Sequence, residues 1–301
     1  MQNMSPILVV GRNGQLARAM MALANESRLP IVAYGRPELD LRDAGAIRRI
    51  VVENRPQAIV NAAAYTMVDK AESEAEAAFE INRDGPAYLA AAASELCIPL
   101  IHISTDYVFD GTKTTPYREN DKTSPLNIYG RSKLEGESAV LQNHSGAVVL
   151  RTSWVYSVYG QNFVKTMLRL GATRDLVKVV DDQRGAPTLA EDLAAAILKI
   201  IPQLASRGKP GGVYHLTAAG ETSWHGFAAA IFEGWAKRGE KVPTLYAIKT
   251  IDYPTAARRP AYSLLDCSKA AAEFGVKLRP WQQALDQCLD GLRAELMSVR
   301  S

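Results

Sequence analysis

The stretch ILVVGRNGQLARAM, residues 7–20, decides the fold. Its first four residues are apolar and favour a buried β-strand, a turn with two glycines follows at once, and helix-forming residues come next. Gly11 would permit the tight turn, Gly14 a close backbone approach to a pyrophosphate, and Ala17 close packing of the helix on the sheet. The N-terminus of that helix offers unpaired N–H groups and a positive dipole end to phosphates. The stretch therefore predicts the start of a nucleotide-binding domain.

The glycine spacing differs from that of the simplest dinucleotide fingerprint. It is G-x-x-G-x-x-A instead of G-x-G-x-x-G. A glycine pair alone is also compatible with a purely structural turn between a strand and a helix. Because the turn follows the first strand directly, its position favours nucleotide binding.

Apolar β-like runs alternate with Ala-rich helical stretches up to about residue 155. We expect strands at residues 7–10, 31–35, 58–64, 99–105 and 146–156. The stretch 74–97 is typical of a helix, with Gly85 and Pro86 marking a break or a restart. Strands that alternate with helices form right-handed βαβ units. We therefore predict an α/β fold with a Rossmann-like, doubly wound parallel sheet.

Residues 34–40, YGRPELD, form the exit of the second expected strand. An NAD-specific site usually carries an acid near this point to hold the ribose 2′-hydroxyl. This chain has Arg36 there, and a guanidinium suits a 2′-phosphate. We therefore expect NADPH as the cofactor, with NADH left open as a second reductant. Arg36 could equally be a solvated residue of a surface loop.

The pattern becomes less regular after residue 156. Residues 213–218 are typical of another strand, and residues 223–239 of a helix with one apolar face. This last third carries much of the proline and aromatic content, which indicates a second lobe. We predict an NADP-binding Rossmann domain at residues 1–155, joined by about residues 187–218. A smaller mixed α/β C-terminal lobe, at residues 156–186 and 219–301, would bind the substrate.

Composition argues against several classes of protein. The 301 residues are 47% hydrophobic and 22% charged, with a formal net charge of +3 that is dispersed along the chain. This balance argues against nucleic acid and membrane partners. Three widely spaced cysteines (Cys97, Cys267 and Cys288) do not suggest a disulfide framework or a zinc site, and they favour a reducing compartment. The first residues lack the features of a signal peptide, and no apolar run is long enough for a membrane span, so we expect a cytoplasmic protein.

Residues 129–133, YGRSK, place a phenol and an ammonium on one face of a helix. Ketone reduction needs a hydride source, a proton donor and a polar group that holds the carbonyl oxygen. Tyr129 could give the proton if a cation stabilises its phenolate, and Lys133 could supply that charge. Thr105 ends an expected strand, at the edge of the sheet where ligands bind in open α/β folds. Taken alone, a tyrosine and a lysine at this spacing can also be ordinary residues of an exposed helical turn.

A series of longer motifs resembles a known family. They are NAAAYTMVDKAE (61–72), STDYVFDG (104–111), SPLNIYGRSKLEGE (124–137), RTSWVYS (151–157), NFVKTML (162–168), DDQRGAPT (181–188) and YHLTAAGETSWHGFA (214–228). In this order, after the glycine turn, they resemble the dTDP-4-dehydrorhamnose reductase family of the extended short-chain dehydrogenase/reductase superfamily. The resemblance extends through nearly the whole chain.

The resemblance implies a reaction and a set of site residues. The family reduces the 4-keto group of dTDP-4-dehydro-6-deoxy-L-mannose to dTDP-L-rhamnose, a sugar donor for cell-wall polysaccharide and lipopolysaccharide. By this resemblance Tyr129 would protonate O4, Lys133 would lower the tyrosine pKa, and Thr105 would hold the carbonyl. The sugar nucleotide would lie against Thr105, Asp106 and Trp154. The cofactor would contact Gly11, Asn13, Gly14, Gln15, Asp40, Leu41, Ala62, Ala63 and Ala64, in addition to Arg36, Tyr129 and Lys133.

Two positions depart from the family pattern. Members that dimerise through Mg²⁺ carry a Glu where this chain has Ala19, although the later acid Glu191 is present. The loss of one carboxylate weakens a small set of oxygen ligands, so we expect no strong metal site and a monomer or a weak homodimer. In ARRPAYS (257–263), Tyr262 replaces an Asn that the family usually has. Arg259 is kept and could clamp a diphosphate, or it could be a surface residue in a turn.

Two other functions fit the same fold. A sugar-nucleotide epimerase, dehydratase or other reductase is the first, but a 4,6-dehydratase needs an acid directly after Asp106, where this chain has Tyr107. A regulatory protein that binds NADP without catalysis is the second, and it would not need Tyr129 and Lys133 together. We interpret His102 as a packed histidine, and His215 and His225 as lacking a second metal ligand. Trp224 is interpreted as packing within the lobe.

Overall fold

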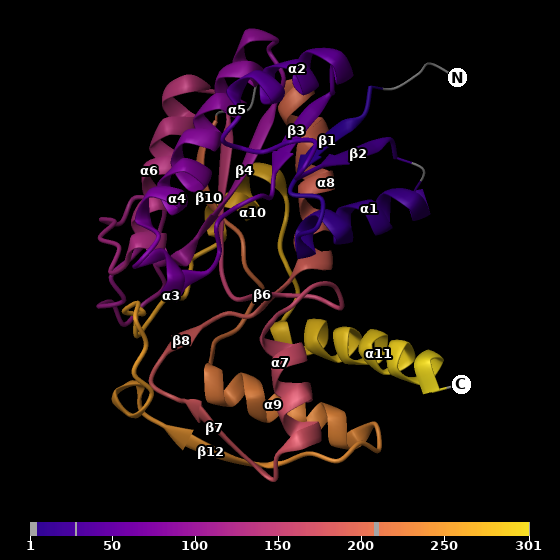
Figure 1. Ribbon diagram of the computed structural model, residues 1–301, viewed down its shortest axis with the longest axis vertical. Helices are drawn as coiled ribbons and strands as arrows, with labels where there is room; N and C mark the ends of the chain where they lie inside the picture. Colours follow the sequence, from indigo (N-terminus) through magenta and orange to yellow (C-terminus); the bar gives the residue numbers. More distant parts are fainter. Residues whose placement is uncertain (1–4, 28, 208–210, 301) are drawn as a thin grey trace.

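A computed structural model of the chain describes residues 5–27, 29–207 and 211–300. Its larger part is built on one parallel six-stranded sheet in the order β10-β5-β4-β3-β1-β2 (Figure 1). The strands are β1 (Ile7–Val10), β2 (Ile31–Tyr34), β3 (Ala58–Asn61), β4 (Leu100–Thr105), β5 (Val148–Thr152) and β10 (Gly212–His215). The predicted Rossmann-like doubly wound sheet is thereby confirmed. Residues 1–4, where we expect no signal peptide, lie outside the described residues.

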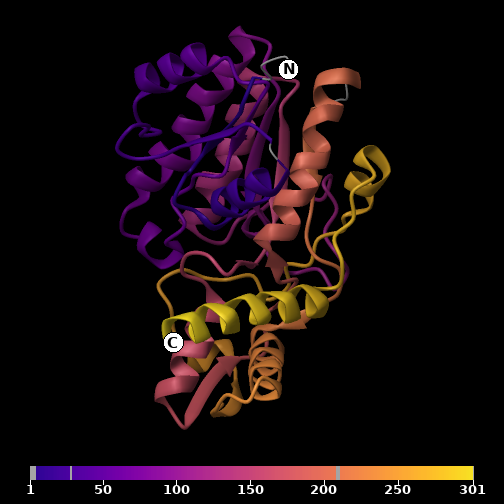
Figure 2. The same cartoon turned by 90° about the vertical axis from the view of Figure 1, so that its right-hand side faces the viewer.

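Helices cover both faces of this sheet. On one face lie α1 (Gln15–Ser27) and α8 (Ala190–Arg207); on the other lie α2 (Ala44–Asn54), α5 (Gly85–Glu95) and α6 (Ile128–Asn143) (Figures 1 and 2). In β1, Ile7 and Val9 pack toward α1 and α8, whereas Leu8 and Val10 pack toward α2 and α5. A strand that is buried on both faces must be apolar throughout, which explains the unbroken run ILVV.

The helix expected at residues 74–97 is divided. It consists of α4 (Ala75–Phe79), a π-helical turn η1 (Glu80–Asp84) and α5, and it is preceded by the short α3 (Val68–Ala71). The restart falls at Gly85 and Pro86. A Cβ on Gly85 would lie 2.6 Å from Cβ of Leu41, so the close approach of the loop after β2 requires glycine there. Pro86 lacks a backbone N–H, and this costs no hydrogen bond in the first turn of a helix, where that group has no partner within the helix.

The strand expected at residues 146–156 is also divided, into β5 and β6 (Val155–Tyr156). The break falls at Trp154, whose φ of 48° is left-handed and incompatible with a continuous strand. β6 leaves the sheet and pairs in parallel with β9 (Thr188–Leu189). The strand expected at residues 213–218 is present as β10, which begins and ends earlier.

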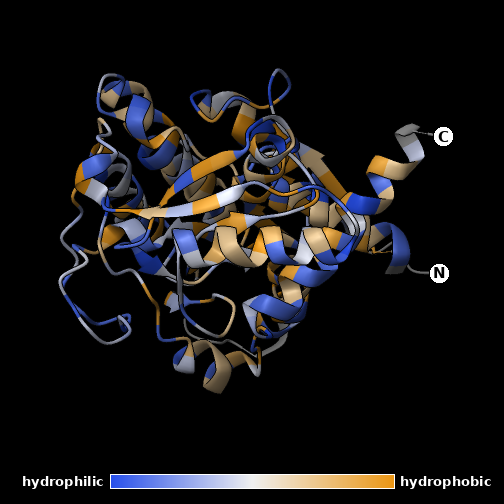
Figure 3. Ribbon diagram, turned by 90° about the horizontal axis from the view of Figure 1, so that it is seen from below, coloured by the Kyte–Doolittle hydropathy of each residue, from blue (hydrophilic) through white to orange (hydrophobic). Residues whose placement is uncertain are grey.

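A smaller lobe lies below the sheet in Figure 1. It contains α7 (Phe163–Thr173), β7 (Leu176–Val180), α9 (Trp224–Lys237), β12 (Thr244–Ile248) and α11 (Trp281–Arg300), and β7 pairs in parallel with β12. Its helices carry hydrophobic and hydrophilic residues in turn (Figure 3), and their apolar faces share one core. Shorter elements complete the chain: η2 (Asp106–Val108), β8 (Arg184–Gly185), β11 (Thr222–Ser223), η3 (Thr250–Asp252) and α10 (Ser268–Phe274).

One part of the chain departs from the expected boundary between the two regions. Ala270 and Phe274 of α10 belong to the core beneath α8 and the sheet, although we expected residues 219–301 in the lobe. The ring of Tyr214 of β10 packs at a tilt of 58° against that of Phe274, with centroids 4.8 Å apart, and so connects α10 to the sheet. Residues 208–210 and 301, which fall in the two expected ranges, lie outside the described residues. In the part of the chain that the structure describes, no helix is long and apolar enough to cross a membrane.

Candidate active site

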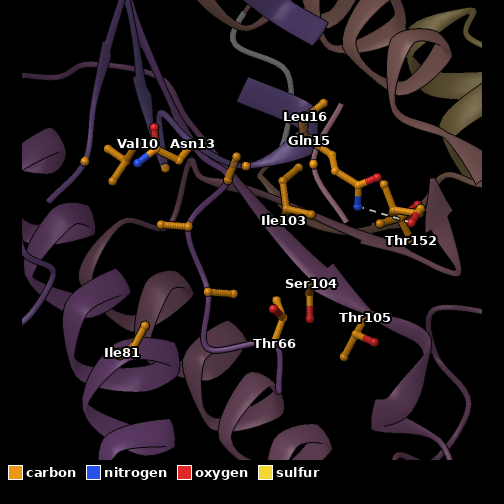
Figure 4. A pocket seen from close by; sticks show the side chains of 18 of the residues that line it. Val10, Asn13, Gln15, Leu16, Thr66, Ile81, Ile103, Ser104, Thr105 and Thr152 are labelled. Carbon is orange, nitrogen blue, oxygen red and sulfur yellow. Dashed lines mark hydrogen bonds between the residues drawn. The ribbon is translucent and has the colours of Figure 1, made fainter. Parts of the chain in front are cut away.

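A cavity of about 700 Å³ opens at the carboxyl ends of β1 to β5. Its wall contains every residue that we expect to contact the cofactor: Gly11, Asn13, Gly14, Gln15, Arg36, Asp40, Leu41, Ala62, Ala63, Ala64, Tyr129 and Lys133. It also contains Thr105, Asp106 and Trp154, which are three of the four residues expected to bind substrate. Figure 4 shows side chains from the glycine turn, the end of β4 and the segment after β3 around this space. The structure thus brings together residues that are distant in the sequence.

The glycine turn is shaped by close backbone contacts. Gly11 has a φ of 105°, and a Cβ there would lie 2.9 Å from the amide nitrogen of Ala63. The amide of Gly14 donates to the carbonyl oxygen of Gly11 at 2.8 Å, and α1 starts at Gln15. The first turn of α1 therefore faces the cavity with N–H groups that have no partner within the helix. This geometry fits a dinucleotide phosphate.

Two arginines lie near the exit of β2: Arg36 follows this strand, and Arg12 of the glycine turn donates its backbone amide to the carbonyl oxygen of Tyr34. Arg36 lines the cavity, and so does Arg12, which donates to both carboxylate oxygens of Glu38 at 3.2 and 2.9 Å. Asp40 accepts hydrogen bonds from Arg42, and these, with a smaller contribution from the charge of Arg36, lower the Asp40 pKa to about 2. The cavity end next to β2 therefore combines a charged carboxylate with two guanidinium groups. Sequence reasoning missed Arg12, although it directly follows Gly11 in the turn.

The helix α6 carries the tyrosine and the lysine on one face. Asn127 caps its N-terminus by accepting from the amide of Gly130 at 2.7 Å. Gly130, which lies between the two, has no room for a side chain, because a Cβ there would lie 2.2 Å from the carbonyl oxygen of Tyr107. Tyr107 and Tyr129 meet edge to face, with ring centroids 5.8 Å apart. Tyr129 is thereby positioned by its own helix and by the segment after β4.

Burial controls the ionisation of both groups. It raises the Tyr129 pKa to about 12; the Thr105 hydroxyl opposes this shift and the Asp106 carboxylate adds to it. It lowers the Lys133 pKa to about 8, against the opposing effect of the Glu137 carboxylate. The Lys133 ammonium donates to the carbonyl oxygen of Ile103 at 2.7 Å. At neutral pH Tyr129 therefore carries its proton, and Lys133 is mainly the cation.

Polar side chains at the end of β4 line the cavity. The Thr105 hydroxyl donates to Asp106 at 3.0 Å and accepts from the amide of Tyr107 at 3.1 Å. Burial raises the Asp106 pKa to about 6. Oδ2 of Asp106 and Oγ1 of Thr152, both from cavity-lining residues, have no hydrogen-bond partner among the described residues. Buried polar atoms of this kind are usually satisfied by a ligand or by water.

Trp154 lines the cavity in a strained conformation. Its ring stacks on Trp224 of α9 at a centroid distance of 3.6 Å and an angle of 7°. Gly185 makes room for it, since a Cβ on Gly185 would lie 2.8 Å from Cε2 of Trp154. A left-handed tryptophan costs conformational energy, and such strain clusters at functional sites. Trp224 therefore does more than pack within the lobe, because it supports a residue of the cavity wall.

Arg259 is not among the residues that line the cavity. It donates to both carboxylate oxygens of Asp69, at 3.1 and 2.7 Å, and to the carbonyl oxygen of Ala257. This ion pair joins the segment after η3 to α3. The diphosphate contact that we expect of Arg259 would compete with Asp69.

Glu191 is the one acid of the expected magnesium set that this chain keeps, and its buried Oε2 has no hydrogen-bond partner among the described residues. Oε1 of Glu191 accepts from the Ser157 hydroxyl at 2.7 Å, and burial raises the Glu191 pKa. Ala19 is fully buried and offers no ligand. Among the described residues there is no group of three or more His, Cys, Asp and Glu side chains that could hold a metal ion.

Sequence reasoning missed one buried group. Glu137 of α6 accepts from Ser104 of β4 at 2.5 Å and forms an ion pair with Arg151 of β5 at 2.6 Å. Both charged side chains are almost fully buried, at 3% and 4% exposure. A signal was available, because Glu137 lies at the same four-residue spacing after Lys133 as Lys133 does after Tyr129.

Comparisons with known proteins agree with this geometry. The family described as RmlD substrate binding domain matches residues 4–294. The dTDP-4-dehydrorhamnose reductase of Sinorhizobium fredii is 46% identical over 280 residues, which cover 92% of this chain and 94% of that protein.

Two solved structures support the same assignment. The dTDP-4-dehydrorhamnose reductase of Clostridium acetobutylicum is 36% identical with a TM-score of 0.90, covering 96% of this chain and 99% of that one. The Bacillus anthracis enzyme, solved in complex with NADP, is 35% identical with a TM-score of 0.89 and the same coverage. The chain belongs to the dTDP-4-dehydrorhamnose reductase family.

Proposed function

We propose that this chain reduces the 4-keto group of dTDP-4-dehydro-6-deoxy-L-mannose with NADPH and so forms dTDP-L-rhamnose. The observation that carries the proposal is that Thr105, Tyr129 and Lys133 face the same cavity as the glycine turn. Membership of the family agrees with it. The product would be a sugar donor for polysaccharide biosynthesis.

The cavity fits NADPH at both of its ends. The glycine turn and the first turn of α1 would hold the pyrophosphate, and Arg36 would contact the 2′-phosphate, helped by Arg12. Asp40, Leu41 and residues 62–64 would line the adenosine side. When bound, NADPH supplies a hydride to the carbonyl carbon.

Tyr129 would give the proton that the reduced oxygen needs. Its raised pKa means that it arrives protonated, so the difficulty lies in stabilising the phenolate that it becomes. The Thr105 hydroxyl already opposes the raised pKa. Lys133 is the nearby cation of the cavity wall, and it would favour the phenolate as the proton leaves.

The substrate would be held by groups that surround Tyr129. Thr105 would hold the carbonyl oxygen, which requires its hydroxyl to turn from Asp106 toward the substrate. The free Oδ2 of Asp106 would then accept from a sugar hydroxyl. Trp154, which follows the end of the neighbouring strand β5, would contact the sugar nucleotide, and Arg259 would contact the diphosphate.

A direct assay tests this function. The protein is supplied with NADPH and the dTDP-4-keto sugar, and NADPH oxidation is compared with dTDP-L-rhamnose formed. We expect a ratio of one to one. A panel of other keto-sugar nucleotides, including UDP sugars, measures specificity, because a related reductase would prefer one of them. If NADPH binds but this substrate produces no oxidation, the assignment is wrong.

The setting in which the enzyme works is part of the proposal. The three cysteines are unpaired thiols, of which Cys97 is exposed, and this suits a reducing compartment such as the cytoplasm. We propose a monomer or a weak homodimer, since the residues around Ala19 do not supply a metal bridge.

A further inference from the structure

A buried row of polar side chains crosses the sheet beneath the active site. Ser104 of β4, Arg151 of β5 and His215 of β10 are register partners on adjacent strands. Arg151 donates to Nε2 of His215 at 3.4 Å, while Nδ1 of His215 lies 3.1 Å from the carbonyl oxygen of Tyr117 and donates to it. Burial and the charge of Arg151 lower the His215 pKa to about 3, so this histidine is neutral.

Glu137 of α6 lies over this row and joins its parts. Oε1 accepts from the Ser104 hydroxyl at 2.5 Å and from Nε of Arg151 at 2.9 Å, and Oε2 accepts from Nη2 of Arg151 at 2.6 Å. Within the described part of the chain, the hydrogen bonds of this carboxylate thus go to β4 and β5. The bidentate geometry is the strong form of an arginine–carboxylate pair.

Two successive residues of β4 are therefore held from two successive turns of α6. Lys133 donates to the carbonyl oxygen of Ile103, and Glu137 accepts from the hydroxyl of Ser104. The next residue in the chain is Thr105, which lines the cavity. Both α6 side chains are nearly fully buried, so these two contacts hold the strand end that carries Thr105 against the helix that carries Tyr129, in addition to the pairing of Thr105 with Thr152 of β5.

The charge of Glu137 also acts on Lys133. Lys133 precedes Glu137 by four residues in α6, so the two side chains lie on the same face of the helix. The other titratable or charged groups on the elements around Lys133 lie at different distances from it. His102 of β4 is 3.4 Å from the ammonium, Tyr129 of α6 and Asp106 of η2 line the same cavity, and Arg151 of β5 is held by Glu137. His102 is neutral, since burial keeps its pKa well below its usual range, and Tyr129 is protonated. Glu137 is the charged group that raises the Lys133 pKa against burial.

We propose that Glu137 is a positioning residue of the reductase, which fixes the end of β4 through Ser104 and favours the ammonium form of Lys133 through its charge. This inference rests on the proposed function for its catalytic consequence. The effect of Glu137 on the ionisation of Lys133 does not depend on any substrate. The inference and the proposed function can therefore be tested separately.

The first experiment titrates Lys133 without substrate. The side-chain carbon resonance of Lys133 in lysine-labelled protein, assigned by comparison with Lys133→Arg, is followed against pH in wild type and in Glu137→Gln. We expect the midpoint to fall by roughly one pH unit, which is the lower end of the effect of a nearby opposite charge. An unchanged midpoint overturns the proposal, whatever the activity.

The second experiment measures kcat/KM for the keto sugar against pH at saturating NADPH. In Glu137→Gln we expect the alkaline limb of this pH profile to move to lower pH by a similar amount, because a smaller fraction of Lys133 stays protonated at a given pH. Ser104→Ala removes the hydrogen bond and keeps the charge, so it should lower kcat without moving the limb. If wild type is inactive with this substrate, the proposed function fails, and the Lys133 titration still decides the inference.

A matched control and a compensated variant complete the design. Glu135→Gln changes a carboxylate of the same helix that is paired at the surface with Arg83 and Arg131, and it should shift neither the titration nor the limb. Glu137→Gln leaves the buried Arg151 unpaired and can fail to fold, so the double variant Glu137→Gln/Arg151→Gln is measured beside it. Its shift should have the same sign and be smaller, because loss of the Arg151 cation partly offsets loss of the carboxylate. An equal shift in Glu135→Gln, or failure of both Glu137 variants to fold, overturns the proposal.

Discussion

Arg259 and Asp69 form a bidentate ion pair in which Nη1 lies 3.1 Å from Oδ1 and Nη2 lies 2.7 Å from Oδ2. The pair connects α3, beside the sheet, to the segment that follows η3. Asp69 also accepts from the amide of Ala257 at 3.0 Å. The arginine that we expect at the substrate diphosphate is therefore already held by a carboxylate.

Replacing each partner separates two roles for Arg259. If it contacts the diphosphate, Arg259→Ala loses a charge-assisted interaction, which corresponds to roughly a tenfold or larger rise in the KM of the sugar nucleotide. Asp69→Asn weakens the competing pair, so it should change that KM less than about threefold. Steady-state kinetics with both substrates check this, and the KM for NADPH should not change. Equal losses in the two variants would show that Arg259 only ties the segments together.

Tyr129→Phe should remove most turnover and leave cofactor binding intact. The change deletes a proton donor, and general acid catalysis contributes about 10²–10⁴-fold. We therefore expect kcat to fall by at least about 100-fold, while the NADPH dissociation constant measured by fluorescence changes less than about twofold. Tyr246→Phe, which changes an exposed phenol of β12, is the control and should match wild type. A Tyr129→Phe enzyme with near wild-type kcat would remove this residue from the mechanism.

Arg36→Ala should affect the two reductants differently. Loss of a guanidinium from a 2′-phosphate site should raise the KM for NADPH about tenfold and leave that for NADH nearly unchanged. Arg48→Ala is the matched control, because Arg48 pairs with Glu95 on the exposed side of α2. Similar changes for NADPH and NADH would contradict the 2′-phosphate assignment.

The strands and the edge of the cavity could be predicted because their signals are local. An apolar run such as residues 7–10 must be buried on both faces, and the carboxyl ends of parallel strands meet at one edge. Thr105, Tyr129 and Lys133 therefore lie together in the structure as the pattern indicates. The family resemblance added the substrate, which no spacing of residues could indicate.

The remaining features depend on contacts between distant segments. The break at Trp154 accompanies its contacts with Trp224 and Gly185, and the pairing of Arg259 depends on Asp69, 190 residues earlier. Strand and helix periodicities contain no information about such partners. The same reason explains why the pairing of Glu137 with Arg151 was missed.

Removal of divalent metal should leave the assembly unchanged. Ala19 offers no ligand, and one oxygen of Glu191 is already bound by Ser157. We expect the same sedimentation coefficient in excess EDTA and in millimolar Mg²⁺, and the same kcat. The sedimentation coefficient and kcat of Glu191→Gln should likewise be the same in EDTA and in Mg²⁺, since this variant lacks the remaining acid of the expected metal site. Dissociation on adding EDTA to wild type, but not to Glu191→Gln, would demonstrate a metal-bridged dimer.

Asp106 should make the protein less stable as the pH rises from about 4 to about 6. Burial raises its pKa from 3.8 to about 6, so the folded state binds this proton more tightly than the unfolded state. The contribution of this group to the free energy of unfolding is fully present below pH 4 and is lost as the pH rises through 6. The shift corresponds to about 3 kcal/mol.

Asp106→Asn isolates this contribution from that of other carboxylates, many of which have lowered pKa values and give the opposite slope. The free energy of unfolding in urea is measured for both proteins at pH 4 and at pH 7.5. Since an amide has no proton to lose, the variant should gain about 2–3 kcal/mol relative to wild type between these two pH values. Parallel curves for the two proteins would show that Asp106 ionises in the folded state as easily as in the unfolded chain, and that its unpaired oxygen is already solvated.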